Sequence, residues 1–408
     1  MRCGLLGEKL SHSYSPQIHR LLADYEYPLY EIPPEAIGAF LRSDCFDAIN
    51  VTIPYKKSVI PYCAELSAQA KRLGAVNTII KKADGRLIGH NTDYFGFSAM
   101  VRRTGVNPIG KKALVLGSGG AGVTARAVLE DMGANVITIS RSGKNNYENI
   151  SLHQDASILV NATPVGMYPN NGVSPIRLDT LTNLECVLDL IYNPARTKLL
   201  LDAEKRGIIA ENGLYMLVAQ AKESYEWFTG FLCNDDVIAP IVGALKAQME
   251  NIILIGMPGC GKSTLGKLLA QKLGKDFVDA DTCITEKAGM AIPDIFSSLG
   301  ESGFRKLEAE VLRDLGKKSG LVIATGGGCV TKSENYESLH QNGTILWIQR
   351  STNALPTDGR PLSQTNSLEK LYHARAPLYS AFADKTVNND ASVEDGLNAL
   401  TEALKEHT

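Results

Sequence analysis

The sequence has no uninterrupted apolar run long enough to span a bilayer. Its first residues form only a short apolar stretch without a cleavage-site pattern, so we expect no signal peptide. Neither sign of charge is in excess, because the net charge is -2 and 21% of the residues are charged. This balance offers no basic stripe to nucleic acid or to an anionic membrane. We therefore expect a cytoplasmic protein that binds small molecules, with no nucleic-acid and no membrane partner.

Paired cysteines are also missing. The chain has eight cysteines but no Cys-x-x-Cys motif, and no histidine lies at a spacing that suits zinc. We predict that all of them are reduced thiols, as is usual inside cells. They are Cys3, Cys45, Cys63, Cys186, Cys233, Cys260, Cys283 and Cys329.

The chain does contain a repeated alternation of apolar runs and helical stretches, which predicts an α/β fold with mostly parallel sheets. At 408 residues it is too long for one ordinary core. Expected strands lie at 3–6, 48–53 and 78–80, then at 112–116 and 135–139, and finally from 251 to 255. We predict three domains, at 1–100, 101–211 and 250–408, with helices near 212–248 completing the first.

The junction near 231–250 contains no Gly/Ser-rich tether. Residues 235–248 are predicted to be helical, because Val237, Ile241 and Leu245 share one helix face. We therefore expect the two halves to be packed together or semi-rigidly joined.

A glycine-rich loop follows the strand expected at 251–255 and precedes a helical stretch. It reads Gly-Met-Pro-Gly-Cys-Gly-Lys-Ser from Gly256 to Ser263, which fits the Walker A pattern. Glycines let backbone N–H groups surround phosphates, and the helix N-terminus adds a favourable dipole. Lys262 would neutralise the β- and γ-phosphates, and Ser263 would ligate Mg²⁺. The predicted ATP-binding residues are Gly259, Cys260, Gly261, Lys262, Ser263 and Thr264.

The residues that follow this loop indicate what kind of molecule accepts the phosphate. Asp279 and Asp281 are expected on one face at the end of a second strand, one for the metal and one for an acceptor hydroxyl. Arg305 and Glu308 share a helix face at i, i+3, which suits a carboxylate clamp or simply a solvated ion pair. A third strand leads into the glycines at 326–328, which permit close backbone approach to a ligand.

Together with Arg360 in a Gly-Arg-Pro-Leu loop and Arg375 on a later helix, this set resembles shikimate kinase over 251–408. The resemblance implies a P-loop NTPase-type, nucleoside monophosphate kinase-like domain that uses ATP and Mg²⁺. It implies Ser263 and Asp279 as metal ligands, and a mobile lid that carries Arg360 and excludes water. It assigns the acceptor to Asp281, Arg305, Gly327, Gly328 and Arg375, and the catalytic roles to Lys262, Asp281 and Arg360.

A second glycine loop, Gly-Ser-Gly-Gly-Ala-Gly at 117–122, lies between the strand expected at 112–116 and a helix. This context fits the dinucleotide fingerprint of a Rossmann domain. The following strand ends in Ser-Arg-Ser-Gly-Lys rather than in an acid, and a guanidinium there suits a ribose 2′-phosphate. We therefore predict NADP(H). The predicted cofactor residues are Gly117, Ser118, Gly119, Gly120, Ala121, Ser140, Arg141, Ser142, Lys144, Thr163 and Gly213.

Four short polar clusters lie upstream, at 11–16, 50–56, 74–78 and 91–93, where strands end or helices start. Singly, each has a structural explanation: Ser15 before Pro16 fits a helix N-cap, and Lys56 fits a surface lysine. Together with Rossmann motifs they resemble shikimate dehydrogenase over about 3–248. The resemblance implies a Lys56–Asp93 catalytic dyad. It implies that the substrate is bound by Ser13, Ser15, Thr52, Lys56, Asn77, Asp93, Tyr192 and Gln220.

The sequence thus predicts a bifunctional enzyme of aromatic amino-acid precursor synthesis. One half would reduce 3-dehydroshikimate with NADPH, and the other would phosphorylate shikimate with MgATP. Two alternatives stay open at this point: a quinate-utilising dehydrogenase fused to the kinase, and a ligand-binding sensor that keeps both folds. Oligomeric state is not readable from the sequence, and a homo-oligomer is compatible with it.

Overall fold

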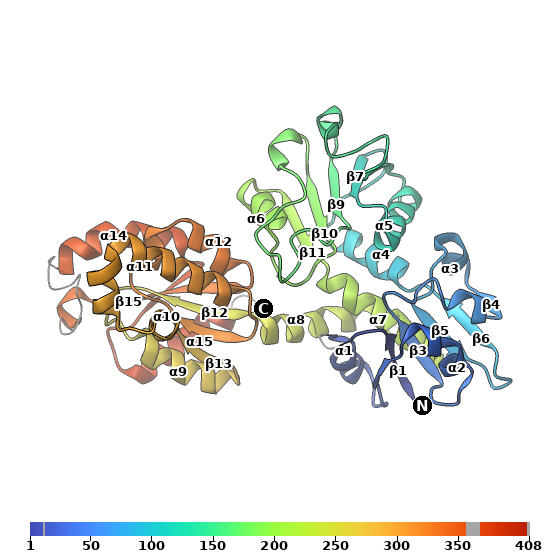
Figure 1. The fold of residues 1–408 in the computed structure, drawn as a ribbon, viewed down its shortest axis with the longest axis horizontal. Helices are drawn as coiled ribbons and strands as arrows, with labels where there is room; N and C mark the ends of the chain where they lie inside the picture. Colours follow the sequence, from blue (N-terminus) through green and yellow to red (C-terminus); the bar gives the residue numbers. More distant parts are fainter. Residues whose placement is uncertain (11–12, 356–367, 406–408) are drawn as a thin grey trace. The chain divides into compact units, whose positions relative to one another are not determined.

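The computed structural model describes residues 1–10, 13–355 and 368–405. The chain divides into two compact units, which are described separately. The N-terminal unit comprises Met1–Met167, Val173–Tyr192 and Leu199–Val242, and the C-terminal unit comprises Tyr168–Gly172, Asn193–Lys198 and Gly243–Thr408. Figure 1 shows their α/β elements along the chain.

The first sheet of the N-terminal unit has six strands in the order β2-β1-β3-β5-β6-β4. Its strand pairs are parallel except β3–β5 and β5–β6, which are antiparallel. A short turn joins β5 to β6. The strands are β1 (Cys3–Gly7), β2 (Leu29–Glu31), β3 (Ala48–Val51), β4 (Glu65–Leu66), β5 (Thr78–Lys81) and β6 (Leu87–His90). The helices that accompany them are α1 (Ser15–Leu22), α2 (Ile37–Arg42), α3 (Ala68–Leu73) and α4 (Asp93–Arg103).

The second sheet of this unit has five parallel strands in the order β11-β10-β9-β7-β8. The chain starts at β7, moves outward to β8 and then crosses to β9, so the strand order reverses beside β7, as in doubly wound nucleotide-binding folds. The elements are β7 (Lys112–Leu116), α5 (Gly120–Asp131), β8 (Asn135–Ile139), β9 (Ile158–Asn161), β10 (Cys186–Asp189), α6 (Lys198–Lys205) and β11 (Ile209–Asn212).

Two helices complete the N-terminal unit and continue the chain. They are α7 (Leu214–Thr229) and α8 (Ile238–Met249). α7 packs on α1 and α4 and against β3 and β5. α8 buries Ile238, Ile241 and Leu245 at helical spacing. Only Glu250 separates the end of α8 from the next strand.

The C-terminal unit is built on five parallel strands in the order β13-β14-β12-β15-β16. Near-continuous Val, Ile and Leu runs make β12, β14 and β15 buried on both faces. α9 and α15 pack together, as do α11 and α12 (Figure 1). The elements are β12 (Asn251–Ile255), α9 (Lys262–Leu273), β13 (Asp276–Asp279), α10 (Ala280–Ala288), α11 (Ile292–Gly316), β14 (Leu321–Ala324), α12 (Glu334–His340), β15 (Gly343–Gln349), α14 (Leu368–Phe382), β16 (Lys385–Asn388) and α15 (Val393–Lys405).

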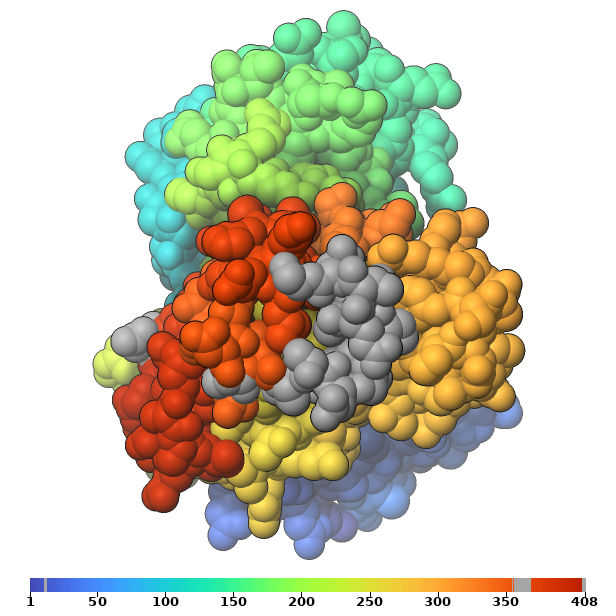
Figure 2. Space-filling view, turned by 90° about the vertical axis from the view of Figure 1, so that its left-hand side faces the viewer, coloured from blue at the N-terminus to red at the C-terminus, as the bar shows by residue number. Residues whose placement is uncertain are grey.

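Figure 2 looks onto one face of this C-terminal unit. The yellow segment of α9, the gold segment of α10 and α11 and the red-orange segment of α14 all reach this face, although they are far apart in sequence. Among the described residues, no helix is both long and apolar enough to cross a membrane. All eight cysteines are free thiols, as predicted.

Candidate active sites

The loop between β12 and α9 wraps around its own lysine. Gly256, Gly259 and Gly261 have φ of 143°, 83° and 101°, values that only glycine adopts without strain. Nζ of Lys262 donates to the carbonyl oxygens of Gly256 at 2.9 Å and Met257 at 3.0 Å. The ammonium is therefore held inside the loop, beside the N-terminus of α9, where an anion is favoured.

This loop forms one end of a cavity of about 570 Å³. The predicted ATP-binding residues Gly259, Gly261, Lys262, Ser263 and Thr264 all line the cavity. Cys260 does not, because its side chain is fully buried beneath the loop. An open, glycine-lined loop around a lysine fits nucleotide phosphates.

Asp279 and Asp281 lie beside the glycine loop, but they do not belong to the same strand. Ser263 Oγ donates to Asp279 Oδ2 at 2.7 Å, so the two predicted metal ligands are adjacent. β13 ends at Asp279, and Asp281 belongs to the first turn of α10. The prediction that Asp281 extends the strand is therefore wrong. Asp279 Oδ1 accepts from the backbone N–H of Asp281 at 3.0 Å, and this N-cap starts a helix in place of the strand.

Arg305 and Glu308 form a buried ion pair rather than a solvated one. Arg305 Nη1 donates to Glu308 Oε2 at 2.7 Å, and the side chains are only 6% and 1% exposed. Burial raises the pKa of Glu308, against the opposing effect of the Arg305 charge. A Cβ on Gly328 would collide with the Arg305 guanidinium. The glycine therefore leaves the space that the guanidinium occupies.

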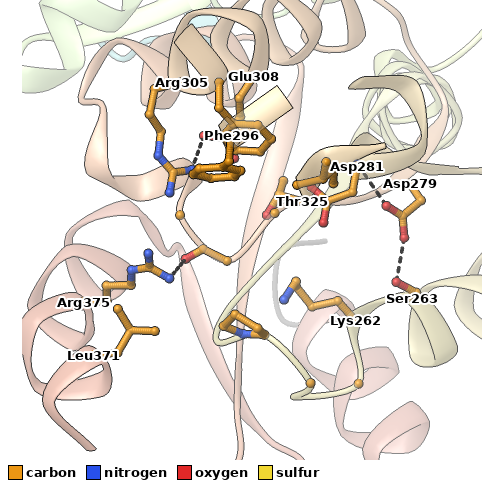
Figure 3. A pocket seen from close by; sticks show the side chains of 18 of the residues that line it. Lys262, Ser263, Asp279, Asp281, Phe296, Arg305, Glu308, Thr325, Leu371 and Arg375 are labelled. Carbon is orange, nitrogen blue, oxygen red and sulfur yellow. Dashed lines mark hydrogen bonds and ion pairs between the residues drawn. The ribbon is translucent and has the colours of Figure 1, made fainter. Parts of the chain in front are cut away.

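A second arginine is fixed against the same glycine segment. Arg375 Nη1 donates to the carbonyl oxygen of Gly327 at 3.1 Å, and Tyr379 donates its hydroxyl to the same oxygen. In Figure 3, Arg305 and Arg375 lie on one side of the cavity, and Lys262, Ser263 and Asp279 lie on the other. The cavity thus has one end lined by two guanidinium groups and another end formed by the glycine loop and its lysine. Arg360 lies outside the described residues.

In the N-terminal unit, Lys56 and Asp93 meet directly. Lys56 Nζ lies 2.6 Å from Asp93 Oδ2, and the side chains are 31% and 18% exposed. Asp93 is the first residue of α4, where the helix dipole stabilises its negative charge. The cation and the carboxylate are therefore paired but still reachable from solvent.

The predicted hydroxyl-binding residues surround the start of the same helix. Asn77 Oδ1 accepts from the backbone N–H of Thr92 at 2.8 Å, and Thr92 Oγ1 donates to Gln220 Oε1 at 3.3 Å. Asn77 and Gln220 are thereby brought to the residue that precedes Asp93. Thr52 is half-buried just after β3.

The start of α1 differs from its prediction. The N-cap is Tyr14 and not Ser15, and the Ser15 backbone N–H donates to Ser13 Oγ at 3.2 Å. The ring of Tyr14 meets that of Tyr192 edge to face at a centroid distance of 6.0 Å. This contact brings the predicted substrate residue Tyr192 to the loop that carries Ser13 and Ser15.

The dinucleotide loop has the open backbone that a pyrophosphate needs. A Cβ on Gly119 or Gly120 would meet nothing within 4 Å, whereas one on Gly122 would collide with the carbonyl of Gly117. The first two glycines therefore leave space above the N-terminus of α5, and the last lets helix and strand pack closely. Ser118 and Ala121 lie in the same turn.

The other predicted cofactor residues follow neighbouring strands. After β8, a turn closed by the Ser140 N–H to the Asn145 carbonyl at 3.2 Å exposes Arg141, Ser142 and Lys144. Thr163 follows β9, and its hydroxyl donates to Asn161 Oδ1 at 2.7 Å. Gly213 follows β11 and packs against the backbone of Leu190. All of these positions lie at the carboxyl ends of the parallel strands, where such sheets bind ligands.

Comparison with known proteins identifies both parts. The NADP(+)-dependent shikimate dehydrogenase of Clostridium beijerinckii is 38% identical over 244 residues, covering 55% of this chain and 90% of that protein. The chain belongs to the shikimate dehydrogenase family. The family model for the shikimate dehydrogenase substrate-binding domain matches residues 5–79, and the shikimate kinase model matches residues 258–405. The chain is therefore a bifunctional enzyme of the shikimate pathway, with NADP(H), ATP and Mg²⁺ as its cofactors.

Solved structures agree for the N-terminal part. Shikimate dehydrogenase 1 from Peptoclostridium difficile is 39% identical, with a TM-score of 0.54, and covers 60% of this chain and 97% of its own. A Thermus thermophilus shikimate 5-dehydrogenase in complex with NADP(H) and shikimate is 30% identical, with a TM-score of 0.55 over 60% of this chain and 99% of that one. The predicted fold class is thus confirmed.

Several residues of the cavity in the C-terminal unit were given no role by the sequence reasoning. Phe296 and Thr325 line the kinase cavity, and Tyr379 fixes the Gly327 carbonyl. None of these side chains belongs to a local motif, so only the tertiary structure reveals them.

Proposed function

We propose that the N-terminal unit reduces the ketone of 3-dehydroshikimate to the hydroxyl of shikimate, and that the C-terminal unit phosphorylates that same hydroxyl. The observation that carries this proposal is the presence, on one chain, of two polar sites that each contain a close ion pair. One holds the Lys56–Asp93 pair at 2.6 Å, and the other sets the Arg305–Glu308 pair at 2.7 Å opposite a P-loop.

In the dehydrogenase site, Lys56 holds a proton at Nζ and donates it to the ketone oxygen as that oxygen becomes negative. Asp93 orients the ammonium through the 2.6 Å contact. NADPH supplies the hydride for the carbonyl carbon when bound at 117–122. Ser13 and Ser15 hold the substrate carboxylate, whereas Thr52, Asn77, Tyr192 and Gln220 orient its ring.

The proposed 2′-phosphate site consists of the exposed Arg141, Ser142 and Lys144 and the half-buried Ser140. Exposed donors beyond the end of β8 suit a dianion, because a guanidinium binds phosphate oxygens in a bidentate manner. Thr163 and Gly213 line the nicotinamide side.

In the kinase site, Arg305 and Arg375 hold the carboxylate of shikimate through charge-assisted hydrogen bonds. Asp281 accepts a hydrogen bond from the attacking hydroxyl, and the backbones of Gly327 and Gly328 contact the ring. Lys262 neutralises the phosphate charge that develops during transfer. Ser263 and Asp279 hold Mg²⁺, and MgATP supplies the phosphoryl group when bound. Arg360 is proposed to close over that group.

The proposed domain division keeps residues 1–100 with helices near 212–248, a cofactor domain at 101–211 and the kinase at 250–408. Free cysteines and balanced charge support a cytoplasmic location without nucleic-acid or membrane partners.

The test is a pair of assays on the purified full chain. We expect NADPH oxidation that depends on 3-dehydroshikimate, and ADP formation that depends on shikimate. Parallel reactions in the oxidative direction, with quinate or NAD in place of shikimate or NADP, measure the preference for each. Absence of either activity in a folded chain contradicts the bifunctional proposal. A preference for quinate would mean that the N-terminal unit is a quinate dehydrogenase.

A further inference from the structure

A buried serine on α7 joins the separate pieces of the dehydrogenase site. Ser224 is fully buried, and its Oγ lies at the centre of a polar network. It donates to the backbone carbonyl of Gln220 at 2.9 Å and accepts from Asn50 Nδ2 at 2.7 Å. The hydroxyls of Thr78 and Thr92 each lie 3.0 Å from it. Four elements, β3, β5, the start of α4 and α7, therefore converge on one oxygen atom.

A serine hydroxyl has one proton and two lone pairs. The proton goes to the Gln220 carbonyl and Asn50 takes one lone pair, so the remaining lone pair can accept from only one of the two threonine hydroxyls. Thr92 Oγ1 also contacts Asn77 Nδ2 at 3.0 Å and Gln220 Oε1 at 3.3 Å. The protons of Ser224 and Thr92 thus determine which polar atoms Asn77 and Gln220 can present to a substrate.

The spacing between α4 and α7 makes this arrangement rigid. A Cβ on Gly96 would press on the Met216 carbonyl and on Gln220 Cβ, so the helices are in close contact there. Thr92 is the N-cap of α4, and Asp93 is the next residue. Because Ser224 holds Thr92, it also holds the backbone of the next residue, Asp93, whose side chain contacts Lys56.

We propose that Ser224 is a positioning residue for the dehydrogenase: it touches no reacting atom but fixes Asn77, Gln220 and the Asp93 turn in one geometry. This inference rests on the proposed reduction of 3-dehydroshikimate. A hydroxyl in an otherwise apolar helix–sheet contact would be replaceable by alanine at little cost to activity. A positioning residue would instead lose substrate affinity selectively, because Asn77 and Gln220 contact the substrate and not the nucleotide.

The experiment compares Ser224→Ala with Thr229→Val in the full chain. Thr229 lies at the end of the same helix, where it donates to the Tyr225 carbonyl at 2.9 Å and accepts from the Phe231 backbone N–H at 3.2 Å. Its variant therefore loses a matching intrahelical bond and one local turn contact, but leaves the network intact. We expect Ser224→Ala to raise KM for 3-dehydroshikimate roughly tenfold to hundredfold, as expected for the loss of one or two buried hydrogen bonds. KM for NADPH and the kinase activity of the same preparation should stay within about twofold, as should all parameters of Thr229→Val.

An unchanged KM for 3-dehydroshikimate in Ser224→Ala, or an equal rise for NADPH, overturns the positioning role. The wild-type chain is assayed first, and inactivity there refutes the proposed function instead. Kinase activity reports folding of the C-terminal unit only, so circular dichroism and thermal unfolding check the N-terminal unit. If Ser224→Ala does not fold, Ser224→Cys provides the same comparison, because a thiol is of similar size but a weak donor.

Discussion

The two sites are assembled in different ways. The kinase site takes its shape from backbone: a glycine loop enclosing Lys262, and a glycine turn that admits Arg305. The dehydrogenase site is held by side chains from four separate elements, joined through Ser224. The backbone of the kinase site is therefore specified by two short glycine segments of the sequence. A site made from a side-chain network depends on distant residues, so it is open to damage from many positions.

The largest expected effect separates the two activities completely. Lys262→Ala should lower kinase kcat/KM by at least about 10²-fold, because a positive charge at the phosphates is removed. Lys56→Ala should lower dehydrogenase activity by about 10²- to 10⁴-fold, as for loss of a general acid. Both activities are measured on each variant. Each variant serves as the other's control, and loss of both activities in either one would contradict independent sites.

The next effect tests how strongly the kinase site depends on its buried ion pair. Glu308→Ala leaves Arg305 buried without its main partner, so we expect a loss of about 3–5 kcal/mol in unfolding free energy. Trp347 is buried in this unit and is one of two tryptophans. Urea unfolding of the variant and of its parent is measured by Trp347 fluorescence, with Trp227→Phe present in both chains.

The matched control for Glu308 is Glu310→Ala on the same helix. Glu310 pairs with Lys287 at 3.2 Å and is 53% exposed, so its removal should cost less than about 1 kcal/mol. Equal losses for the two variants would show that the buried pair has no special weight.

A smaller effect probes backbone access in the kinase site. Gly328 has an ordinary φ of -105°, so Gly328→Ala adds no backbone strain, only a Cβ in the path of the Arg305 guanidinium. We expect KM for shikimate to rise about tenfold, equivalent to 1.4 kcal/mol, with KM for ATP unchanged. Gly243→Ala, whose Cβ meets nothing within 4 Å, is the control. If both nucleotide and acceptor affinities fall together, the guanidinium explanation fails.

The smallest effect concerns the pH dependence of the N-terminal unit. Burial lowers the pKa of His19 to about 3, below its value of about 6.5 in an unfolded chain. The unfolded state therefore binds the proton first. The contribution of His19 to the unfolding free energy is therefore fully present above about pH 6.5. It decreases as the pH is lowered from about 6.5 to about 3, by up to about 1.4 kcal/mol per pH unit.

Replacing this histidine should flatten the dependence. His19→Gln is expected to reduce the slope of unfolding free energy against pH between 6.5 and 5, followed by Trp227 fluorescence. It cannot remove the slope entirely, because burial also lowers the pKa of His90, to about 4. His373→Gln, an exposed position on α14, is the control. Identical slopes for wild type and His19→Gln would refute the assignment.

Local motifs account for what the sequence could predict. Both glycine loops lie between the expected strands and helices, and the contacts Lys56–Asp93 and Arg305–Glu308 are confirmed. The roles of these residues stay predictions. Asp281 was misplaced because an N-cap hydrogen bond outweighed the strand alternation. Ser224 carried no signal, since its importance depends on partners in other elements, such as Asn50, which is 174 residues away in the chain.

Asp279 has a consequence beyond its proposed metal role. One of its oxygens caps α10 at Asp281, and the other accepts from Ser263 at 2.7 Å. Neither conservative replacement keeps both contacts. Asparagine keeps the N-cap but removes the negative charge, and glutamate places its charge one methylene too far out to cap the helix. One carboxylate therefore fixes both the Ser263 hydroxyl and the first turn of α10, so a change at this position disturbs both sides of the cavity.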